Sequence, residues 1–178
     1  MLTIRPAQWP DDLARLAGLD SSFTTDRIYR VDRDEWGFAV TEERVDPPLH
    51  KVYGSIDHLE PRIQEADFAV VAEQEGGLVG VAAVKYEPWN RRVEVWHVYV
   101  APAARRSGLG TALPNETEAF ARSAGARCIW VETQNINYPA IQCYRRAGFR
   151  LCGLDEAFYD PKGPGRNEIA LFFVRELI

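Results

Sequence analysis

Residues 105–110 read R-R-S-G-L-G and lie between a predicted strand, 93–100, and a predicted helix, 109–124. Glycines at such a junction allow the backbone to turn tightly and to bring its N–H groups toward an anion. The start of the helix adds partial positive charge, and the two arginines add full charges. The loop therefore suits a pyrophosphate, although its spacing is neither that of a Walker loop nor G-x-G-x-x-G. Because so short a pattern also arises by chance, a plain loop with a helix cap is the alternative interpretation.

A second pattern follows about 30 residues later, where residues 137–149 read N-Y-P-A-I-Q-C-Y-R-R-A-G-F. The spacing N-x-x-A-x-x-x-Y-x-x-x-G-F lies mostly on a predicted helix, 139–147, which Gly148 ends. Tyr144 on this helix could supply a proton to a leaving group. Its alternative role is that of a core aromatic residue at helical spacing.

The remaining pattern predicts one mixed sheet with helices on its faces. We expect strands at 2–6, 67–73, 78–87, 93–100, 127–133, 150–154 and 168–175, and helices at 10–19, 109–124 and 139–147. A strand meander up to residue 100 is followed by alternating strands and helices, which favours an α/β fold of this kind. Residues 20–66 alternate poorly and contain D-P-P at 46–48, so we expect loops and short elements there, with a candidate strand at 36–45. Pro114 lacks the N–H that would bond to Gly110 and is expected to disturb the first turns of its helix.

The composition is that of a single globular domain. The chain has 178 residues, of which 46% are hydrophobic and 26% charged, and this excludes a disordered chain. The longest uncharged apolar stretch, residues 78–84, is too short to cross a bilayer. The first residues lack a basic start followed by an apolar run, so we expect no signal peptide. Cys128, Cys143 and Cys152 lack metal-ligand spacing, so we expect free thiols, no metal site and a cytoplasmic location.

Charge is divided unevenly along the chain. Residues 1–90 hold 17 acidic against 9 basic side chains, whereas residues 91–178 hold 9 against 12. An acidic first half suits a cationic partner and a basic second half an anionic one. Charge scattered over the surface for solubility is the alternative. The acidic total and the lack of a Lys/Arg cluster argue against nucleic acid.

Together, and in this order, the two patterns resemble the GNAT superfamily of acetyl-CoA-dependent N-acetyltransferases, over about residues 67–175. Further segments resemble the streptothricin (nourseothricin) acetyltransferases within it, over about residues 19–173. These segments are L-D-x-S-F-T-T-D at 19–26, V-D-P-P-L at 45–49, W-N-R-R at 89–92, E-T-Q at 132–134, C-G-L-D at 152–155 and N-E-x-A-L at 167–171. The resemblance implies a GNAT fold in one domain, 1–178, with substrate-facing elements mainly in 1–66 and an acetyl-CoA core in 67–175. It also implies acetyl-CoA as co-substrate.

The resemblance assigns roles by matching position. Strands 93–100 and 127–133 would splay apart around the pantetheine arm, and the Val98 N–H would polarise the thioester carbonyl. Tyr144 would protonate the leaving thiolate. The implied cofactor-binding residues are Val98, Val100, Arg105, Arg106, Ser107, Gly108, Leu109, Gly110, Thr111, Asn137, Ala140 and Tyr144.

The general base stays open between two accounts. Glu94 falls where many members of the superfamily carry a carboxylate base, whereas Trp96 stands where the streptothricin enzymes more often place a glutamate. Because side chains alternate along a strand, we expect Glu94 and Trp96 to share a face and His97 to point the other way. Deprotonation through water, with no single base, is the competing account.

The implied substrate is a cationic amine, above all the β-lysine amine of a streptothricin, whose acetylation gives antibiotic resistance. We expect its binding residues to include Asp20, Asp26, Asp46, Glu87, Trp89, Trp96, Glu132, Asp155 and Glu168, with Trp36 as a further wall. One alternative is a GNAT enzyme acting on a polyamine, a small metabolite amine or a protein amine. Another is a non-catalytic CoA-binding module, which only Trp96 favours. We expect a monomer or homodimer, with no nucleic-acid or membrane partner.

Overall fold

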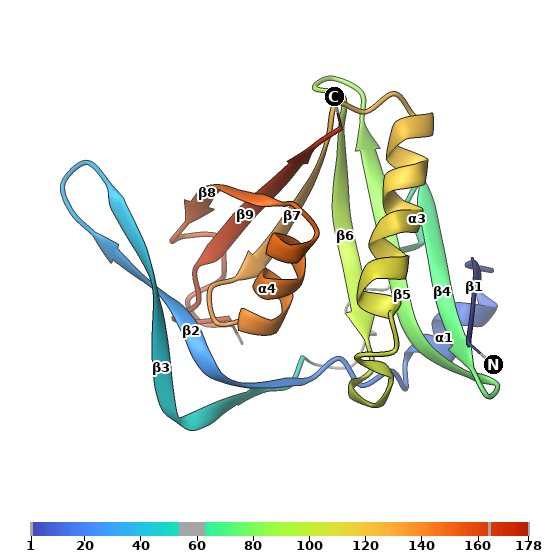
Figure 1. Cartoon of the computed structure of the whole chain (residues 1–178), viewed down its shortest axis with the longest axis horizontal. Helices are drawn as coiled ribbons and strands as arrows, with labels where there is room; N and C mark the ends of the chain where they lie inside the picture. The colour runs from blue at the N-terminus through green and yellow to red at the C-terminus, as the bar shows by residue number, and fades with distance from the viewer. Residues whose placement is uncertain (1, 54–62, 164, 178) are drawn as a thin grey trace. The chain divides into compact units, whose positions relative to one another are not determined.

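The computed structural model describes residues 2–53, 63–163 and 165–177 (Figure 1). In these residues the elements are β1 (Leu2–Pro6), α1 (Asp11–Leu16), β2 (Phe23–Arg33), β3 (Phe38–Lys51), β4 (Phe68–Gln74), β5 (Gly77–Glu87), β6 (Arg92–Val100), the 3-10 helix η2 (Pro102–Ala104), α3 (Leu109–Ser123), β7 (Cys128–Gln134), α4 (Tyr138–Arg146), β8 (Arg150–Asp155) and β9 (Ala170–Glu176). The mixed sheet has the strand order β1-β4-β5-β6-β7-β9-β8, and β2 pairs with β3 separately. None of the described helices is long and apolar enough to cross a membrane.

The chain divides into two compact units. The first comprises residues 1–22, 52–130 and 175–178, and the second comprises 23–51 and 131–174. The strands and helices expected after residue 66 are confirmed within one to two residues at each end. The first helix is shorter than expected, because it begins after Pro10 and is followed by Gly18.

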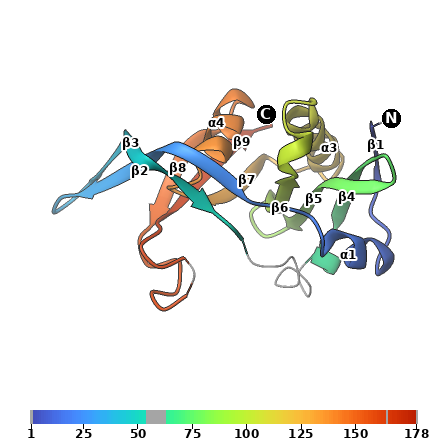
Figure 2. The same cartoon turned by 90° about the horizontal axis from the view of Figure 1, so that it is seen from below.

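In the first unit, a meander of β1, β4, β5 and β6 is covered on both faces (Figure 2). Side chains alternate along β4 and β5, so neighbouring residues belong to opposite cores. The core on the α1 side contains Leu16, Leu19, Ile63, Val71, Val81 and Ala83. The core on the α3 side contains Val70, Ala72, Ala82, Ala104, Leu109 and Leu113. Burial on both faces explains why these strands read as nearly continuous apolar runs.

Helix α3 approaches the sheet closely at Gly80. A Cβ there would lie 3.2 Å from the Tyr99 carbonyl oxygen and 3.3 Å from Cδ1 of Leu113. The helix is continuous from Leu109 to Ser123 with Pro114 inside it. Leu109 and Leu113, both fully buried, hold its first turns on the sheet in spite of the missing proline N–H.

The second unit contains a long β2–β3 hairpin where we expected loops. Its strands pair from Phe23 opposite Lys51 to Arg33 opposite Phe38. The candidate strand at 36–45 is therefore confirmed over residues 38–45, as part of the longer β3, and the loops expected in the rest of 23–51 are wrong apart from the turn at 34–37. The register shifts between Thr25 and Arg27, and the D-P-P sequence at 46–48 lies opposite this irregularity. Prolines cannot donate to a strand ladder, and here the extra residues absorb them. Residues 54–62 of this region lie outside the described residues.

Candidate active site

The loop at 105–110 has the backbone of an anion-binding nest. Arg106 has φ 65° and Gly108 has φ 94°, both left-handed, and Gly108 is the N-cap of α3. The Ser107 hydroxyl donates to the Ala104 carbonyl at 2.6 Å and closes the turn. A Cβ on Gly108 would meet nothing within 4 Å, so the space beside the turn is open. Buried Leu109 anchors the first turn of α3 directly after this turn.

Arg105 holds this loop to the rest of the first unit. Its Nε donates to the Val100 carbonyl at 3.1 Å, and its Nη2 donates to the Ser22 carbonyl. Burial lowers the pKa of the Arg105 guanidinium, and the charge of Asp20 opposes that effect. Arg105 therefore positions the loop. The side chain of Arg106 is exposed, so its charge is available to an anion.

A β-bulge at Trp96 changes the faces of β6. Val95 pairs with Val84 and His97 pairs with Ala83, so Trp96 is the extra residue. Residues directly opposite in an antiparallel pair share a face. His97 therefore shares the α1 face with Glu94, which pairs with Lys85, and our expectation that it points the other way is wrong. The bulge broke the alternation on which that expectation depended.

The backbone candidates on β6 lie beyond this bulge. Val98 and Val100 pack their side chains on the α3 core. Their roles in the site would therefore be carried by backbone groups, as the resemblance implies. Tyr99, between them, packs on the α1 side.

Glu94 already has a cationic partner in the structure. Its Oε1 accepts a hydrogen bond from Arg92, and the Arg92 guanidinium lies 4.5 Å from the centroid of the Trp130 ring. The Glu94 side chain is 19% exposed. As a base, Glu94 would have to keep or exchange this partner while it accepts a proton.

An aromatic row on the α1 face escaped the sequence analysis. The rings of His97 and Tyr99 stack with centroids 6.2 Å apart, and Tyr53 meets Tyr99 edge-on at 6.1 Å. Aromatic faces attract cations, which would suit an amine acceptor. The only sequence signal for this row was the aromatic content of β6, because the bulge concealed its face.

The other aromatic and acidic candidates of the first unit are exposed or have local contacts. Trp89 is 81% exposed, and Lys85 Nζ lies 5.8 Å from the centroid of the Trp96 ring. Glu87 pairs with Arg92 at the end of the β5–β6 ladder. Asp20 is exposed, and its Oδ1 accepts from the Ser22 N–H at 2.8 Å.

In the second unit, helix α4 is set by Asn137 and carries Tyr144. Asn137 is the N-cap, and its Oδ1 accepts from the Ala140 N–H at 3.2 Å. Tyr144 is half-buried, and its ring lies 5.7 Å from that of Phe149 and 6.2 Å from that of Phe173. The cap gives the asparagine of the pattern a structural role at the start of α4, and the two phenylalanines pack against the tyrosine ring.

Two of the expected counter-charges lie together in this unit. The Tyr159 hydroxyl donates to Glu132, and Lys51 forms an ion pair with Glu168. Burial raises the pKa of Glu132, the charge of Glu168 raises it further, and the bond from Tyr159 opposes both effects. The sequence analysis missed Lys51 and Tyr159, because only the tertiary fold brings their side chains to these glutamates.

The remaining acidic candidates of this unit have local roles. Asp26 forms an ion pair with Arg44 at 3.7 Å, and Asp155 accepts from the Ala157 N–H at 2.8 Å. Asp46 is exposed in β3, and Trp36 is 90% exposed near the end of the hairpin. Their expected part in substrate binding stays a prediction.

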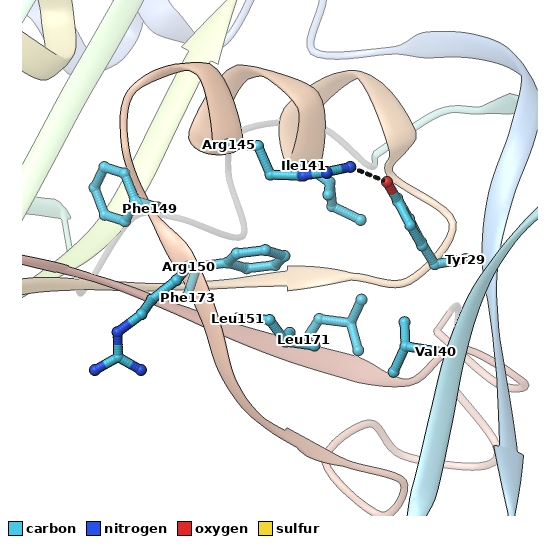
Figure 3. Close-up of a pocket in the computed structure, with 9 residues that line it drawn as sticks. All are labelled: Tyr29, Val40, Ile141, Arg145, Phe149, Arg150, Leu151, Leu171 and Phe173. Carbon is cyan, nitrogen blue, oxygen red and sulfur yellow. Dashed lines mark hydrogen bonds between the residues drawn. The ribbon is translucent and has the colours of Figure 1, made fainter.

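A cavity of about 410 Å³ also lies in the second unit (Figure 3). It is lined by Tyr29, Val40, Ile141, Arg145, Phe149, Arg150, Leu151, Leu171 and Phe173. The Tyr29 hydroxyl accepts from Arg145 and from Gln142, each at 2.9 Å. None of the expected site residues lines this cavity, which is mainly apolar.

Comparison with known proteins places this geometry in context. The profile of the acetyltransferase (GNAT) family matches residues 25–149. The chain is 42% identical to a streptothricin acetyltransferase of Streptomyces lavendulae over 84% of its length and 82% of the relative's. The crystal structure of a nourseothricin acetyltransferase superposes with a TM-score of 0.89 at 40% identity, covering 98% of each chain. A Bacillus anthracis structure in complex with acetyl coenzyme A, 23% identical over 99% of each chain, shares the fold with a TM-score of 0.79.

Proposed function

The chain belongs to the acetyltransferase (GNAT) family and is an acetyl-CoA-dependent N-acetyltransferase, and we propose that its acceptor is a primary amine of a streptothricin-type antibiotic. One observation carries this choice of acceptor. The similarity to streptothricin acetyltransferases extends over most of both chains, including the parts that acetyl-CoA binding does not require. The β-lysine amine is the group that we expect to be acetylated, and the consequence would be resistance to the antibiotic.

The residues of the first unit fit the phosphate end of acetyl-CoA. The nest at 105–110 offers backbone N–H groups, the start of α3 and the charge of Arg106 beside an open space. We assign the pyrophosphate to this nest, with Ser107, Gly110 and Thr111 at its edge. We assign the pantetheine arm to the backbone of Val98 and Val100, with Asn137 and Ala140 as further contacts.

Bound acetyl-CoA supplies the thioester. The protein must deprotonate the amine, stabilise the oxyanion and protonate the leaving thiolate. The acceptor arrives as an ammonium ion and must lose a proton before it can act as a nucleophile. We assign this step to Glu94 or, in the competing account, to a water chain with no single base. The Val98 N–H would stabilise the developing oxyanion, and the Tyr144 hydroxyl would return a proton to the leaving thiolate.

The setting of the reaction forms part of the proposal. We assign residues 1–178 to one catalytic domain, with substrate-facing elements mainly in 1–66 and the acetyl-CoA core in 67–175. We place the enzyme in the cytoplasm, as a monomer or homodimer. A net charge of −5 suits a small cationic amine better than nucleic acid or an anionic membrane surface as partner.

A substrate panel tests this function. Acetyl-CoA consumption is measured with streptothricin, spermidine, an aminoglycoside and a lysine peptide, and kcat/KM is compared. We expect streptothricin to be acetylated with the highest kcat/KM, and mass spectrometry should place the acetyl group on the β-lysine amine. If streptothricin is not acetylated, or is no better than spermidine, its assignment as acceptor fails and only the acetyltransferase activity stands.

A further inference from the structure

Half-buried Glu132 and the buried side chain of Glu168 form a carboxylate pair, and among the described residues Lys51 is the one cation paired with it. Lys51 occupies Oε1 of Glu168, and the Glu168 side chain is 8% exposed. Oε2 of Glu168 is buried and has no hydrogen-bond partner among the described residues. Glu132 accepts from Tyr159, a neutral donor. Two carboxylates and one ammonium leave one negative charge without compensation.

Such a charge is costly inside a protein unless it gains a proton or a counter-ion. The free enzyme can supply the proton, because burial and the charge of Glu168 raise the pKa of Glu132. A cation that binds beside the pair would stabilise both carboxylates in their ionised form. It would therefore take the place of that proton.

The surroundings of the pair are organised by neighbouring contacts. A Cβ on Gly165 would lie 3.1 Å from Cβ and Cγ of Tyr159, so glycine at 165 lets this loop pack closely against the residue whose hydroxyl reaches Glu132. The Ile169 N–H donates to Oδ1 of Asn135 at 2.9 Å and fixes the backbone next to Glu168. The residue that donates to Glu132 and the backbone beside Glu168 are thus both held by contacts outside the pair.

We propose that Glu132 and Glu168 bind a non-reacting primary ammonium group of the acceptor, next to the one supplied by Lys51. This inference rests on the proposed function and narrows its substrate class to amines that carry at least two cationic groups. Lys51 shows that the pair accepts an alkylammonium ion. A monoamine has no group for this site once its single amine is placed for reaction.

The test compares three glutamine variants in steady-state kinetics with streptothricin. Glu132→Gln and Glu168→Gln keep an acceptor oxygen for Tyr159 and Lys51 but remove one charge each. Glu156→Gln is the matched control, because Glu156 belongs to the same unit and pairs with Arg33 near the surface. We expect KM for streptothricin to rise roughly 10- to 100-fold in the first two variants, the loss expected for a charge-assisted bond. KM for acetyl-CoA should stay unchanged in all three.

A second readout follows the proton and needs only the wild-type protein and Glu132→Gln. Streptothricin is titrated calorimetrically in buffers of different ionisation enthalpy, between pH 5 and pH 7. The groups that face Glu132 are Tyr159 and Glu168, with Lys51 behind Glu168. We expect the wild type to release protons on binding, because the cation lowers the pKa of Glu132, and the variant to release fewer.

The outcomes separate this inference from the proposed function. If both variants keep KM within twofold of Glu156→Gln and proton release is unchanged, the ammonium site is overturned although streptothricin is still acetylated. If streptothricin is not acetylated but streptothricin or spermidine binds with a dependence on both glutamates, the site stands and the proposed acceptor fails. Absence of binding by both polycations overturns the site.

Discussion

Asn135 and Ile169 exchange two hydrogen bonds across the second unit. The Ile169 N–H donates to Oδ1 of Asn135 at 2.9 Å, and the Asn135 N–H donates to the Ile169 carbonyl at 2.9 Å. Nδ2 of Asn135 donates to the Tyr29 carbonyl at 2.8 Å, and the residue is only 6% exposed. One buried amide thus joins the end of β7 to β2 and to the backbone beside Glu168.

Asn135→Ala should therefore destabilise the protein by about 2–4 kcal/mol, because it leaves the Ile169 N–H and the Tyr29 carbonyl without partners in a buried place. The free energy of unfolding is measured by denaturant titration. Asn115→Ala is the control, since Asn115 is exposed on α3 and should change stability by less than about 0.5 kcal/mol. If Asn135→Ala loses no more unfolding free energy than Asn115→Ala, the hydrogen bonds of the Asn135 amide do not stabilise the second unit.

Gly108 is expected to be needed for its backbone conformation and for the space beside it. Gly108→Glu should strain the turn by about 1–2 kcal/mol and place a bulky anion where the pyrophosphate is expected. Acetyl-CoA should then no longer raise the melting temperature. Gly76→Glu is the matched control, because Gly76 also has positive φ and open space but lies in the β4–β5 turn. The nest is wrong as the binding site if acetyl-CoA stabilises both variants equally.

The sequence predicted best what depends on local pattern. The loop at 105–110 and the helix that begins after Asn137 are short-range features, and glycine spacing and a helix cap define them within a few residues. The buried strands β4 and β5 were predicted because both of their faces are apolar. The hairpin was not, since much of β3 is exposed and its prolines resemble a loop.

What the sequence could not provide was register. The bulge at Trp96 places His97 on the same face of β6 as Glu94, and no residue type in this stretch indicates a bulge. In the sequence, Glu132 and Glu168 could not be distinguished from the other candidate carboxylates. They lie close together because β7 and β9 are neighbours in the sheet and Glu168 is in the loop before β9. Lys51 joins them from β3, at the end of the hairpin that was not expected.

Tyr144 should contribute its proton and not its packing. Tyr144→Phe keeps the ring between Phe149 and Phe173, so stability and acetyl-CoA affinity should change little. Turnover should fall by roughly 10²- to 10⁴-fold under conditions where the chemical step limits the rate. Tyr138→Phe, on the same helix and stacked on Tyr29, is the control and should keep normal turnover. Near-normal turnover of Tyr144→Phe would remove it from the mechanism.

Asp12 should make the first unit sensitive to acid. It is 1% exposed and accepts two hydrogen bonds from Arg5, at 2.7 and 2.8 Å. The bond from Arg5 holds the pKa of Asp12 below its usual 3.8, against the effect of burial. Its stabilisation is therefore present above pH 3.8 and is lost as the pH falls through the lower folded value.

Asp12→Asn should accordingly lose about 3 kcal/mol of stability at pH 7, and the difference from wild type should shrink in strong acid. Unfolding is followed by denaturant titration at several pH values. Asp11→Asn, one residue earlier and exposed, is the control. A difference between Asp12→Asn and wild type that does not depend on pH would mean that the ion pair is not the source of the stability.

Glu132 should show the opposite dependence. Its folded pKa is raised by burial and then by the charge of Glu168, so its favourable contribution is complete below pH 4.5 and is lost as the pH rises through the folded value. Glu132→Gln carries no such charge and should gain in melting temperature relative to wild type as the pH rises above 4.5. Glu73→Gln provides a control of opposite sign, because bonds from Arg15 and Arg5 lower the pKa of Glu73. At pH 7, added streptothricin should raise the melting temperature of the wild type above that of Glu132→Gln. Its ammonium group would compensate the charge of Glu132 in the wild type, whereas the variant has no carboxylate at this position. A wild type that streptothricin stabilises no more than the variant would show that Glu132 carries its buried charge for another reason.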